Sequence, residues 1–222
     1  MAANFVKGII FDLDGVLVDS MPDHYRAWKI AFKEIAEIEV DERMIYLLEG
    51  MRGIDLVKKI FDQKNYHDCS IAERVNEQKN EIFKKVLNPK PYNGAKELIE
   101  HLKCIKAVVS GSAKEDVELL IDSFFGTGNF DVIITADDIK KGKPDPCAFM
   151  IALKRMKIET SEAIIVENAP LGVEAANKAG IQCIVVLNNT PLIIEDFTNM
   201  INNDRIFEET KSASKLLEDW CS

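Results

Sequence analysis

The feature that most restricts the fold of this chain is an alternation of short apolar runs with helical patterns. Five runs read as buried strands, at residues 8–11, 106–109, 131–134, 163–166 and 183–186. Helical patterns lie between the later runs, such as 113–124, where Ser112 and Glu115 have the spacing of a capping box. Strands and helices that alternate in this way predict an α/β fold, with a Rossmann-like parallel sheet covered by helices on both faces.

Residues 20–88 interrupt this alternation with one helical pattern after another and no convincing strand. Tyr25, Trp28 and Phe32 belong to an apolar stripe on one helix face. Linkers at 15–22 and 88–93 flank the segment, and the prolines of the second linker discourage helix on both sides. We therefore expect a core of residues 1–19 and 89–222, with an α-helical cap of residues 20–88 inserted after the first strand.

The charge balance limits the partners of the chain. Its 28 Lys and Arg residues are outnumbered by 37 Asp and Glu residues, which gives a formal net charge of −9. A surface of this sign disfavours nucleic acid and anionic membranes as partners. No apolar run is long enough to span a membrane, and the sequence does not begin with a signal-peptide pattern.

The five cysteines are odd in number and widely spaced, and no two of them form a CxxC pair. This usage disfavours a disulfide framework or a zinc site and favours a reducing compartment. We expect a soluble cytoplasmic protein with no nucleic-acid or membrane partner. Because a cap of residues 20–88 would itself shield a site, we infer no obligate protein partner.

Polar side chains gather where the predicted strands end. Asp12 and Asp14 follow the first strand, and two carboxylates this close repel each other unless a cation or a proton-transfer role accounts for them. Further polar groups follow the next strands: Ser110 with Gly111, Lys143, and Glu167 with Asn168. Each group alone could be a turn or a helix cap. Together they lie at the carboxyl edge of the sheet, where open α/β folds bind ligands, and predict a site there.

These segments carry a resemblance to a known family. The stretches DLDGVLVDS, VVSGS, GKPDP and VENAPLGVEAANKAG resemble, in this order, the four motifs of the haloacid dehalogenase (HAD) superfamily. The inserted helical cap resembles that of subfamily I, and nearly the whole chain is similar to β-phosphoglucomutase-like and phosphoglycolate-phosphatase-like hydrolases. The resemblance implies a HAD-like core and a Mg²⁺-dependent phosphatase that acts on a small phosphorylated metabolite, of the sugar phosphate or phosphoglycolate class.

The resemblance also implies a role for each motif residue. Asp12 would attack phosphorus and form an aspartyl-phosphate, while Asp14 would protonate the leaving alcohol and later deprotonate the attacking water. The phosphoryl oxygens would be held by Ser110, the amide of Gly111 and Lys143. The Mg²⁺ ligands would be Asp12, the backbone carbonyl of Asp14, Glu167 and Asn168.

One motif residue departs from the family pattern. The family commonly has Glu-Asp where this chain has Glu167-Asn168. Because asparagine keeps a carbonyl oxygen but lacks the charge, we expect weaker Mg²⁺ binding rather than loss of activity.

Two cap residues, His24 and Lys79, are candidate substrate contacts. Each shares a helix row with apolar side chains, Trp28 in the case of His24, so each points with the buried face. A hydrogen-bonded core histidine and a lysine that extends to solvent would give the same pattern. The surrounding DHYRAWK and QKN resemble cap segments of β-phosphoglucomutase, in which this pair reaches the substrate. Arg52 is a weaker candidate, because the cap arginine of that enzyme falls at Gly53.

Two other functions, a phosphomutase and a receiver, remain open at this stage. Asp14 argues against a dehalogenase or a phosphonatase, both of which lack that acid in the resembling pattern. A β-phosphoglucomutase-type sugar phosphomutase is the main alternative. A non-enzymatic phospho-accepting receiver also combines acidic residues, a hydroxyl and a lysine on a parallel sheet, but receivers are shorter and lack a helical insertion.

Overall fold

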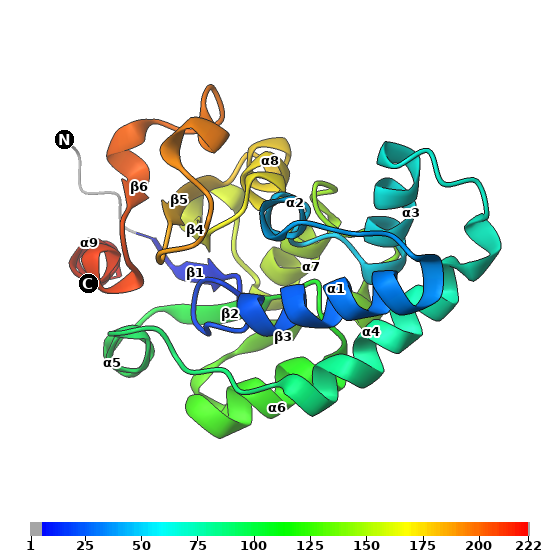
Figure 1. Cartoon of the computed structure of the whole chain (residues 1–222). Coiled ribbons are helices and arrows are strands. Elements are labelled where there is room, and N and C mark those ends of the chain that lie inside the picture. The colour runs from blue at the N-terminus through cyan, green and yellow to red at the C-terminus, as the bar shows by residue number, and fades with distance from the viewer. Residues whose placement is uncertain (1–5, 222) are drawn as a thin grey trace.

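A computed structural model describes residues 6–221, and its core is one six-stranded parallel sheet in the order β3-β2-β1-β4-β5-β6 (Figure 1). The strands are β1 (Gly8–Phe11), β2 (Ile105–Val109), β3 (Val132–Ile134), β4 (Ala163–Glu167), β5 (Gln182–Val186) and β6 (Ile206–Phe207). The predicted α/β class is confirmed, and the five predicted strands agree with the observed ones to within one residue at each end. The sequence analysis missed β6, which is only two residues long and therefore shows no periodic pattern.

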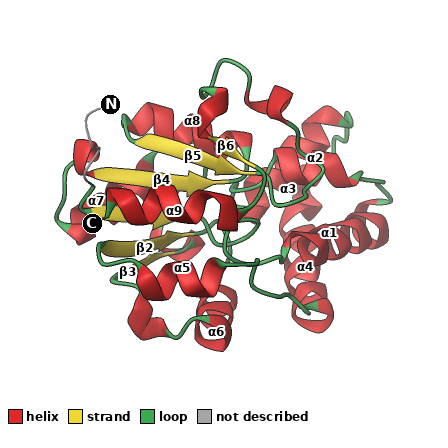
Figure 2. Cartoon of the chain, turned by 90° about the vertical axis from the view of Figure 1, so that its left-hand side faces the viewer, coloured by secondary structure: helices red, strands yellow, loops and turns green. Residues whose placement is uncertain are grey.

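Helices cover both faces of the sheet, as the apolar strands require. Within β1, Ile9 and Phe11 pack into one cluster with α5 (Ala95–His101), α6 (Lys114–Phe124) and α9 (Thr210–Trp220), and α5 and α9 lie in front of the strands in Figure 2. Ile10 points to the opposite face, against α7 (Cys147–Met156) and α8 (Pro170–Ala179). The two-residue period of a strand thus places alternate side chains in two separate cores.

The capping box predicted at α6 is wrong. The N-cap of this helix is Ala113, and no side chain caps it. The backbone N–H of Lys114 donates instead to the Asp137 carboxylate at 2.8 Å. The hydroxyl of Ser112 donates to the carboxylate of Asp14 at 3.0 Å, so this serine serves the end of β1 rather than its own helix.

The predicted helical segment contains α1 (Met21–Ala36), α2 (Glu42–Leu47), α3 (Gly53–Gln63) and α4 (Ala72–Val86). Figure 1 shows α1 and α4 side by side. Phe32 of α1 and Phe83 of α4 are fully buried. The linkers on either side of the segment also lie together, because the N–H of Asp19 donates to the Lys90 carbonyl at 2.8 Å. The division into a core of 1–19 and 89–222 and a cap of 20–88 remains a prediction.

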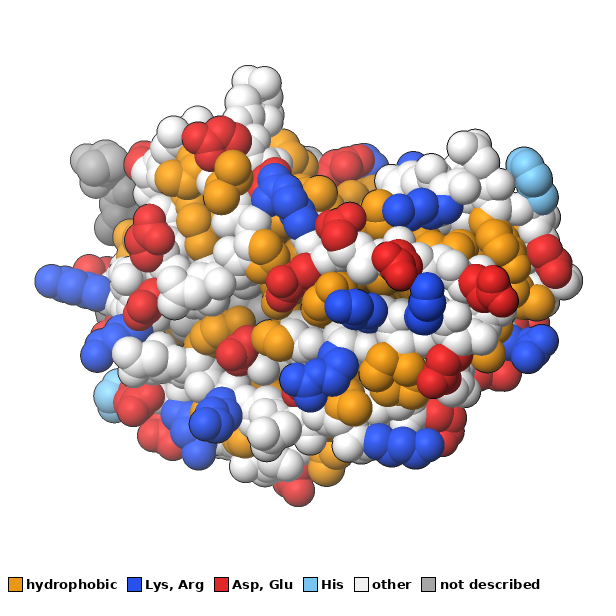
Figure 3. Space-filling view, in the orientation of Figure 1, with side chains coloured by type: hydrophobic (Ala, Val, Ile, Leu, Met, Phe, Trp, Pro, Cys, Tyr) orange, Lys and Arg blue, Asp and Glu red, His pale blue; other side chains and the backbone are white. Residues whose placement is uncertain are grey.

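The cysteine prediction is wrong for one pair, since Cys104 beside β2 and Cys221 after α9 form a disulfide. These residues are 117 positions apart, and the sequence offers no spacing pattern that would join them. Within residues 6–221, no helix is long and apolar enough to cross a membrane. On the face shown in Figure 3, basic and acidic side chains are interspersed over the surface. The cytoplasmic location remains a prediction.

Candidate active site

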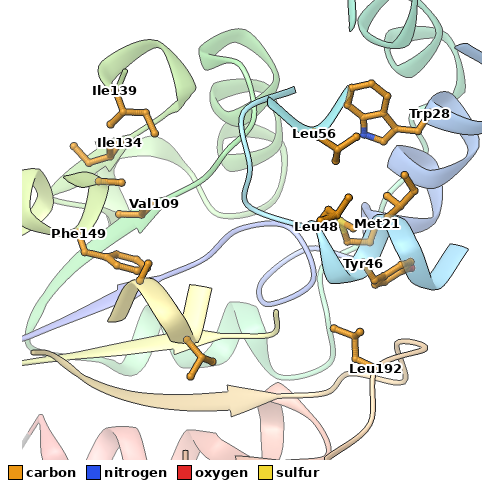
Figure 4. Close-up of a cluster of buried hydrophobic side chains, with 14 of the residues drawn as sticks. Met21, Trp28, Tyr46, Leu48, Leu56, Val109, Ile134, Ile139, Phe149 and Leu192 are labelled. Carbon is orange, nitrogen blue, oxygen red and sulfur yellow. The ribbon is translucent and has the colours of Figure 1, made fainter. Parts of the chain in front are cut away.

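A cavity of about 220 Å³ lies between the carboxyl ends of the strands and the cap helices. Figure 4 shows Met21, Leu48 and Leu56 in the cap, and these side chains form an apolar part of the cavity wall. The predicted site residues that line the cavity are Asp12, Asp14, His24, Arg52, Lys79 and Gly111. The fold therefore brings residues from both predicted domains to one place.

Asp12 lies directly after β1, where its N–H continues the sheet by donating to the Val166 carbonyl at 2.9 Å. Its carboxylate accepts a hydrogen bond from Nζ of Lys143, which also donates to Oε1 of Glu167 at 2.5 Å. All three side chains are buried. Burial raises the pKa of Asp12 well above its usual value, Lys143 opposes that change, and the nearby Glu167 and Asp14 add to it.

Lys143 stays charged in this setting. Burial lowers its pKa, but the carboxylates of Asp12 and Glu167 outweigh burial and hold the pKa above its usual value. The sequence analysis assigned Lys143 to phosphoryl oxygens. In the structure it contacts Asp12 and Glu167, and its role toward a phosphoryl group remains a prediction.

Asp14 has a different set of partners from Asp12. One oxygen accepts from Ser20 Oγ at 2.5 Å and lies 3.3 Å from Nε2 of His24. The other oxygen accepts from the hydroxyls of Ser110 and Ser112, each at 3.0 Å. Burial raises the pKa of Asp14, but His24 and these hydrogen bonds outweigh it and hold the pKa below the usual range. The two aspartates thus occupy separate electrostatic environments, as expected of two carboxylates with different tasks.

Gly15 follows Asp14 and must be glycine in this arrangement. Its φ of +76° lies in the left-handed region, and a Cβ atom there would lie 1.9 Å from Nδ2 of Asn168. Behind this turn, Nδ2 of the buried Asn188 donates to the Gly15 carbonyl at 2.8 Å, and the Thr210 hydroxyl donates to the Val16 carbonyl at 2.7 Å. Asn188, after β5, and Thr210, at the start of α9, therefore hold the aspartate-bearing turn in place.

Glu167 ends β4, and Asn168 follows it. The second oxygen of Glu167 accepts from the N–H of Asn168 at 3.1 Å. The amide Nδ2 of Asn168 donates at 2.8 Å to Glu49, a buried carboxylate from the turn after α2. Burial raises the pKa of Glu49 well above its usual value, and Asp12 adds to that change.

His24 and Lys79 both face the cavity, as predicted, and both are buried. The His24 ring stacks on Phe83 with ring centroids 4.0 Å apart, and Nζ of Lys79 lies 4.5 Å from the same ring centroid. Burial lowers the pKa of His24 and so does the Lys79 charge, and together they outweigh the opposing effect of Asp14. Burial lowers the pKa of Lys79 to about 8.

Arg52 also lines the cavity, but its guanidinium is engaged elsewhere. It donates to the carbonyl of Lys140, in the loop between β3 and α7, at 2.6 Å. This bond joins the cap to the core. Arg52 therefore remains a candidate substrate contact, although its guanidinium already binds the Lys140 carbonyl.

The oxygen-rich edge fits the predicted Mg²⁺ ligands, because Mg²⁺ prefers hard oxygen donors. Within residues 6–221, no three side chains of His, Cys, Asp and Glu form a metal-binding group. The predicted Mg²⁺ ligands are not a group of this kind, because they include the amide oxygen of Asn168 and the backbone carbonyl of Asp14. The amide oxygen of Asn168 is buried without a hydrogen-bond partner among the described residues, which suits an atom that accepts a cation.

Three residues at the site escaped the sequence analysis. Ser20 and Ser112 hold Asp14, and both lie within the quoted motifs, so a closer look at hydroxyls beside the two aspartates would have found them. Glu49 gave no such signal, because it meets Asn168 across 119 positions of sequence.

With this geometry established, comparisons with known proteins identify the family. The family model of haloacid dehalogenase-like hydrolases matches residues 9–186. The chain belongs to this family. HAD membership confirms the resemblance seen in the four motifs, and it makes the chain an enzyme rather than a phospho-accepting receiver.

Two relatives of the chain are phosphatases by name. The phosphorylated carbohydrates phosphatase of Thermotoga maritima is 28% identical over 187 residues, which cover 80% of this chain and 83% of that protein. The fructose-1-phosphate phosphatase YqaB of Escherichia coli is 25% identical over 186 residues, which cover 81% and 95% of the two chains.

A solved HAD structure shares nearly the whole fold. The structure named "Putative beta-phosphoglucomutase from Bacteroides vulgatus" is 30% identical, with a TM-score of 0.87, and the match covers 99% of this chain and 90% of that chain. The comparisons therefore support an enzyme of the HAD phosphatase type and leave a phosphomutase as the alternative.

Proposed function

We propose that this HAD enzyme hydrolyses a small phosphomonoester, with Mg²⁺ as cofactor and Asp12 as the nucleophile. The observation that carries the proposal is the separation of two buried aspartates at one cavity. Asp12 is bound to Lys143, whereas Asp14 is held by Ser20, His24 and two further hydroxyls. A nucleophile and an acid–base group need different environments, and these two have them.

In the first step, an Asp12 oxygen attacks phosphorus, and the bond from phosphorus to the leaving alkoxide breaks. Asp14 gives that oxygen a proton, so the alcohol leaves neutral and Asp12 carries the phosphoryl group. The pKa of Asp14 is held low without substrate, and the negative phosphate beside it raises that pKa toward the protonated form. Lys143 offsets the charge on Asp12 and on the transferring group.

In the second step, Asp14 takes a proton from water, and the resulting hydroxide oxygen attacks phosphorus. The bond between phosphorus and Asp12 breaks, which releases inorganic phosphate and restores both aspartates. The low pKa of Asp14 keeps its carboxylate deprotonated and thus able to accept this proton. Asp12, the Asp14 carbonyl, Glu167 and Asn168 would hold Mg²⁺, which when bound offsets negative charge at the phosphoryl oxygens.

The cavity favours a small substrate. Its volume of about 220 Å³ is below the range of roughly 300–1,000 Å³ typical of sites for drug-sized ligands. His24 offers an imidazole beside Asp14, and Lys79 offers an ammonium group at the cavity wall. These groups suit a phosphorylated metabolite with hydroxyl or carboxylate substituents, such as a sugar phosphate or phosphoglycolate.

A sugar phosphomutase is the second candidate, because the named β-phosphoglucomutase shares 30% identity and almost the entire fold. A mutase must hold a second phosphate in the cap. Arg52 is the arginine of the predicted cap that lines the cavity. Because its guanidinium is bonded to the Lys140 carbonyl, it is less available to bind a second phosphate. We therefore favour hydrolysis.

The test is a screen for phosphate release from sugar phosphates, phosphoglycolate and nucleotides with Mg²⁺. A coupled assay for conversion of glucose 1-phosphate to glucose 6-phosphate is run beside it. We expect phosphate release from at least one small monoester, and Asp12→Asn should abolish it. Efficient isomerisation without phosphate release would overturn the phosphatase proposal in favour of the mutase.

A further inference from the structure

Two buried polar atoms at the candidate active site lack hydrogen-bond partners. They are Oε1 of Glu49 and Oδ1 of Asn168, and no other buried side-chain atom of residues 6–221 is in this state. The two residues are bonded to each other through their remaining polar atoms, Asn168 Nδ2 and Glu49 Oε2, at 2.8 Å. Both unpartnered atoms are oxygens, so the group that would satisfy them is a donor or a cation.

Glu49 reaches this position from the predicted cap. It follows α2 in a turn that lies against the core, where the Gly50 carbonyl accepts from the N–H of Lys143 at 3.1 Å. The free oxygen of Glu49 lies over the aspartate-bearing turn, since a Cβ atom on Gly15 would be 3.1 Å from it. Only 7% of Glu49 is exposed, so bulk water does not solvate its charge.

The charges at this point do not balance. Four buried carboxylates, on Asp12, Asp14, Glu49 and Glu167, meet at the end of the sheet. The ammonium of Lys143 contacts two of them, Asp12 and Glu167. A second cation beside Asn168 and Glu49 would reduce this excess of negative charge and would also satisfy both unpartnered oxygens.

We propose that Glu49 is a metal ligand supplied by the cap, which replaces the charge that Asn168 does not provide. The inference rests on the proposed Mg²⁺ site and extends it by a residue from outside the four motifs. An aspartate at position 168 would place a second carboxylate within hydrogen-bond distance of Glu49. Asparagine instead donates to Glu49 and leaves its own carbonyl oxygen for the ion.

The main rival explanation is that Glu49 only latches the cap to Asn168 through their hydrogen bond. Glu49→Gln separates the two, because glutamine has nearly the same shape and its carbonyl can still accept from Asn168 Nδ2. A latch survives this change, whereas a charged ligand is lost. Glu42→Gln is the matched control, since it removes one exposed carboxylate from the helix that precedes the same turn.

The experiment measures binding of Mn²⁺, used as a spectroscopic substitute for Mg²⁺, to the full chain by calorimetry and by electron paramagnetic resonance. Glu49→Gln should weaken binding by about tenfold or more, the scale on which residues around a metal change affinity. Glu42→Gln should bind as the wild type does. The exchange Glu49→Gln/Asn168→Asp returns a carboxylate to the site from the core side and should restore most of the lost affinity.

A second measurement counts the waters on the bound ion through the relaxation of water protons. Removal of a protein ligand admits a water, so Glu49→Gln should increase the water count at saturating Mn²⁺. Equal affinity and equal water count in the wild type and Glu49→Gln would overturn the inference while leaving the proposed metal site intact. Absence of Mn²⁺ and Mg²⁺ binding to the wild type would overturn the proposed metal dependence as well.

Discussion

Lys79 gives the most quantitative prediction from this structure. Burial lowers its pKa from 10.5 to about 8, although Asp116 and Asp14 act in the opposite direction. At about 1.4 kcal/mol per unit, this change means that keeping Lys79 charged in the folded enzyme costs about 3 kcal/mol. The ammonium is available to an anionic substrate below pH 8 and is lost as pH rises through that value. Lys143 does not titrate there, because its pKa is held above the usual range.

We therefore expect kcat/KM for phosphate release to be level near neutral pH and to fall about tenfold per unit well above pH 8. The assay uses a small phosphomonoester with saturating Mg²⁺. Lys79→Met should give a lower rate without this alkaline fall. Lys84→Met, on the exposed side of the same helix, is the control and should keep the wild-type profile. A wild-type profile that stays level to about one unit above that pKa would refute the reasoning, because the charge would then be irrelevant to catalysis.

Three further predictions concern the carboxylates and the metal. Asp12→Asn should abolish phosphate release and leave the thermal unfolding temperature nearly unchanged, since the two side chains have almost the same size. Asp14→Asn should lose most turnover yet accumulate phosphoenzyme from an aryl phosphate, visible by intact mass, because only proton transfer is impaired. Gly172→Ala should displace the buried Glu167 carboxylate, because its Cβ would lie 2.1 Å from Cδ of Glu167, and this overpacking should outweigh the gain of about 1 kcal/mol from the helix propensity of alanine. We expect this variant to need more Mg²⁺ for half-maximal activity, and an unchanged requirement would contradict the role given to Glu167.

The local features of this fold could be predicted from sequence because they depend on neighbouring residues. The strand that precedes Asp12 is an uninterrupted apolar run, and its paired strands β2 and β4 are mostly apolar, so burial of the central strand on both faces follows from pattern. The row of His24 and Trp28 likewise indicated a buried helix face, and both side chains are buried. The periodicity of a helix indicates which of its faces is buried. In this protein the buried face of α1 also borders the cavity, so the pattern identified residues that line it.

Features that depend on distant partners could not be predicted in this way. Ser112 has the spacing of a helix cap, but its hydroxyl donates instead to the carboxylate of Asp14, which is far away in sequence. The Cys104–Cys221 disulfide joins two segments that have no common pattern. Glu49 resembles any acidic residue near a helix end until the turn that carries it is placed against Asn168. In each case the deciding interaction is tertiary, and residue spacing contains no information about it.

The Glu49–Asn168 pair also bears on how closure and metal binding relate in this enzyme. The turn that carries Glu49 contacts the core through the bond from Lys143 N–H to the Gly50 carbonyl and through the Glu49 side chain. If Glu49 is a ligand, the ion has its full set of oxygen donors only when this turn is seated. Ion binding must then favour the seated turn by the same free energy with which the seated turn favours the ion, because linkage is reciprocal. A carboxylate at position 168 would bind the ion from the core alone and would remove that linkage. On this proposal, asparagine at 168 would make metal affinity depend on the position of the turn that carries Glu49, in a way that the four motifs by themselves do not reveal.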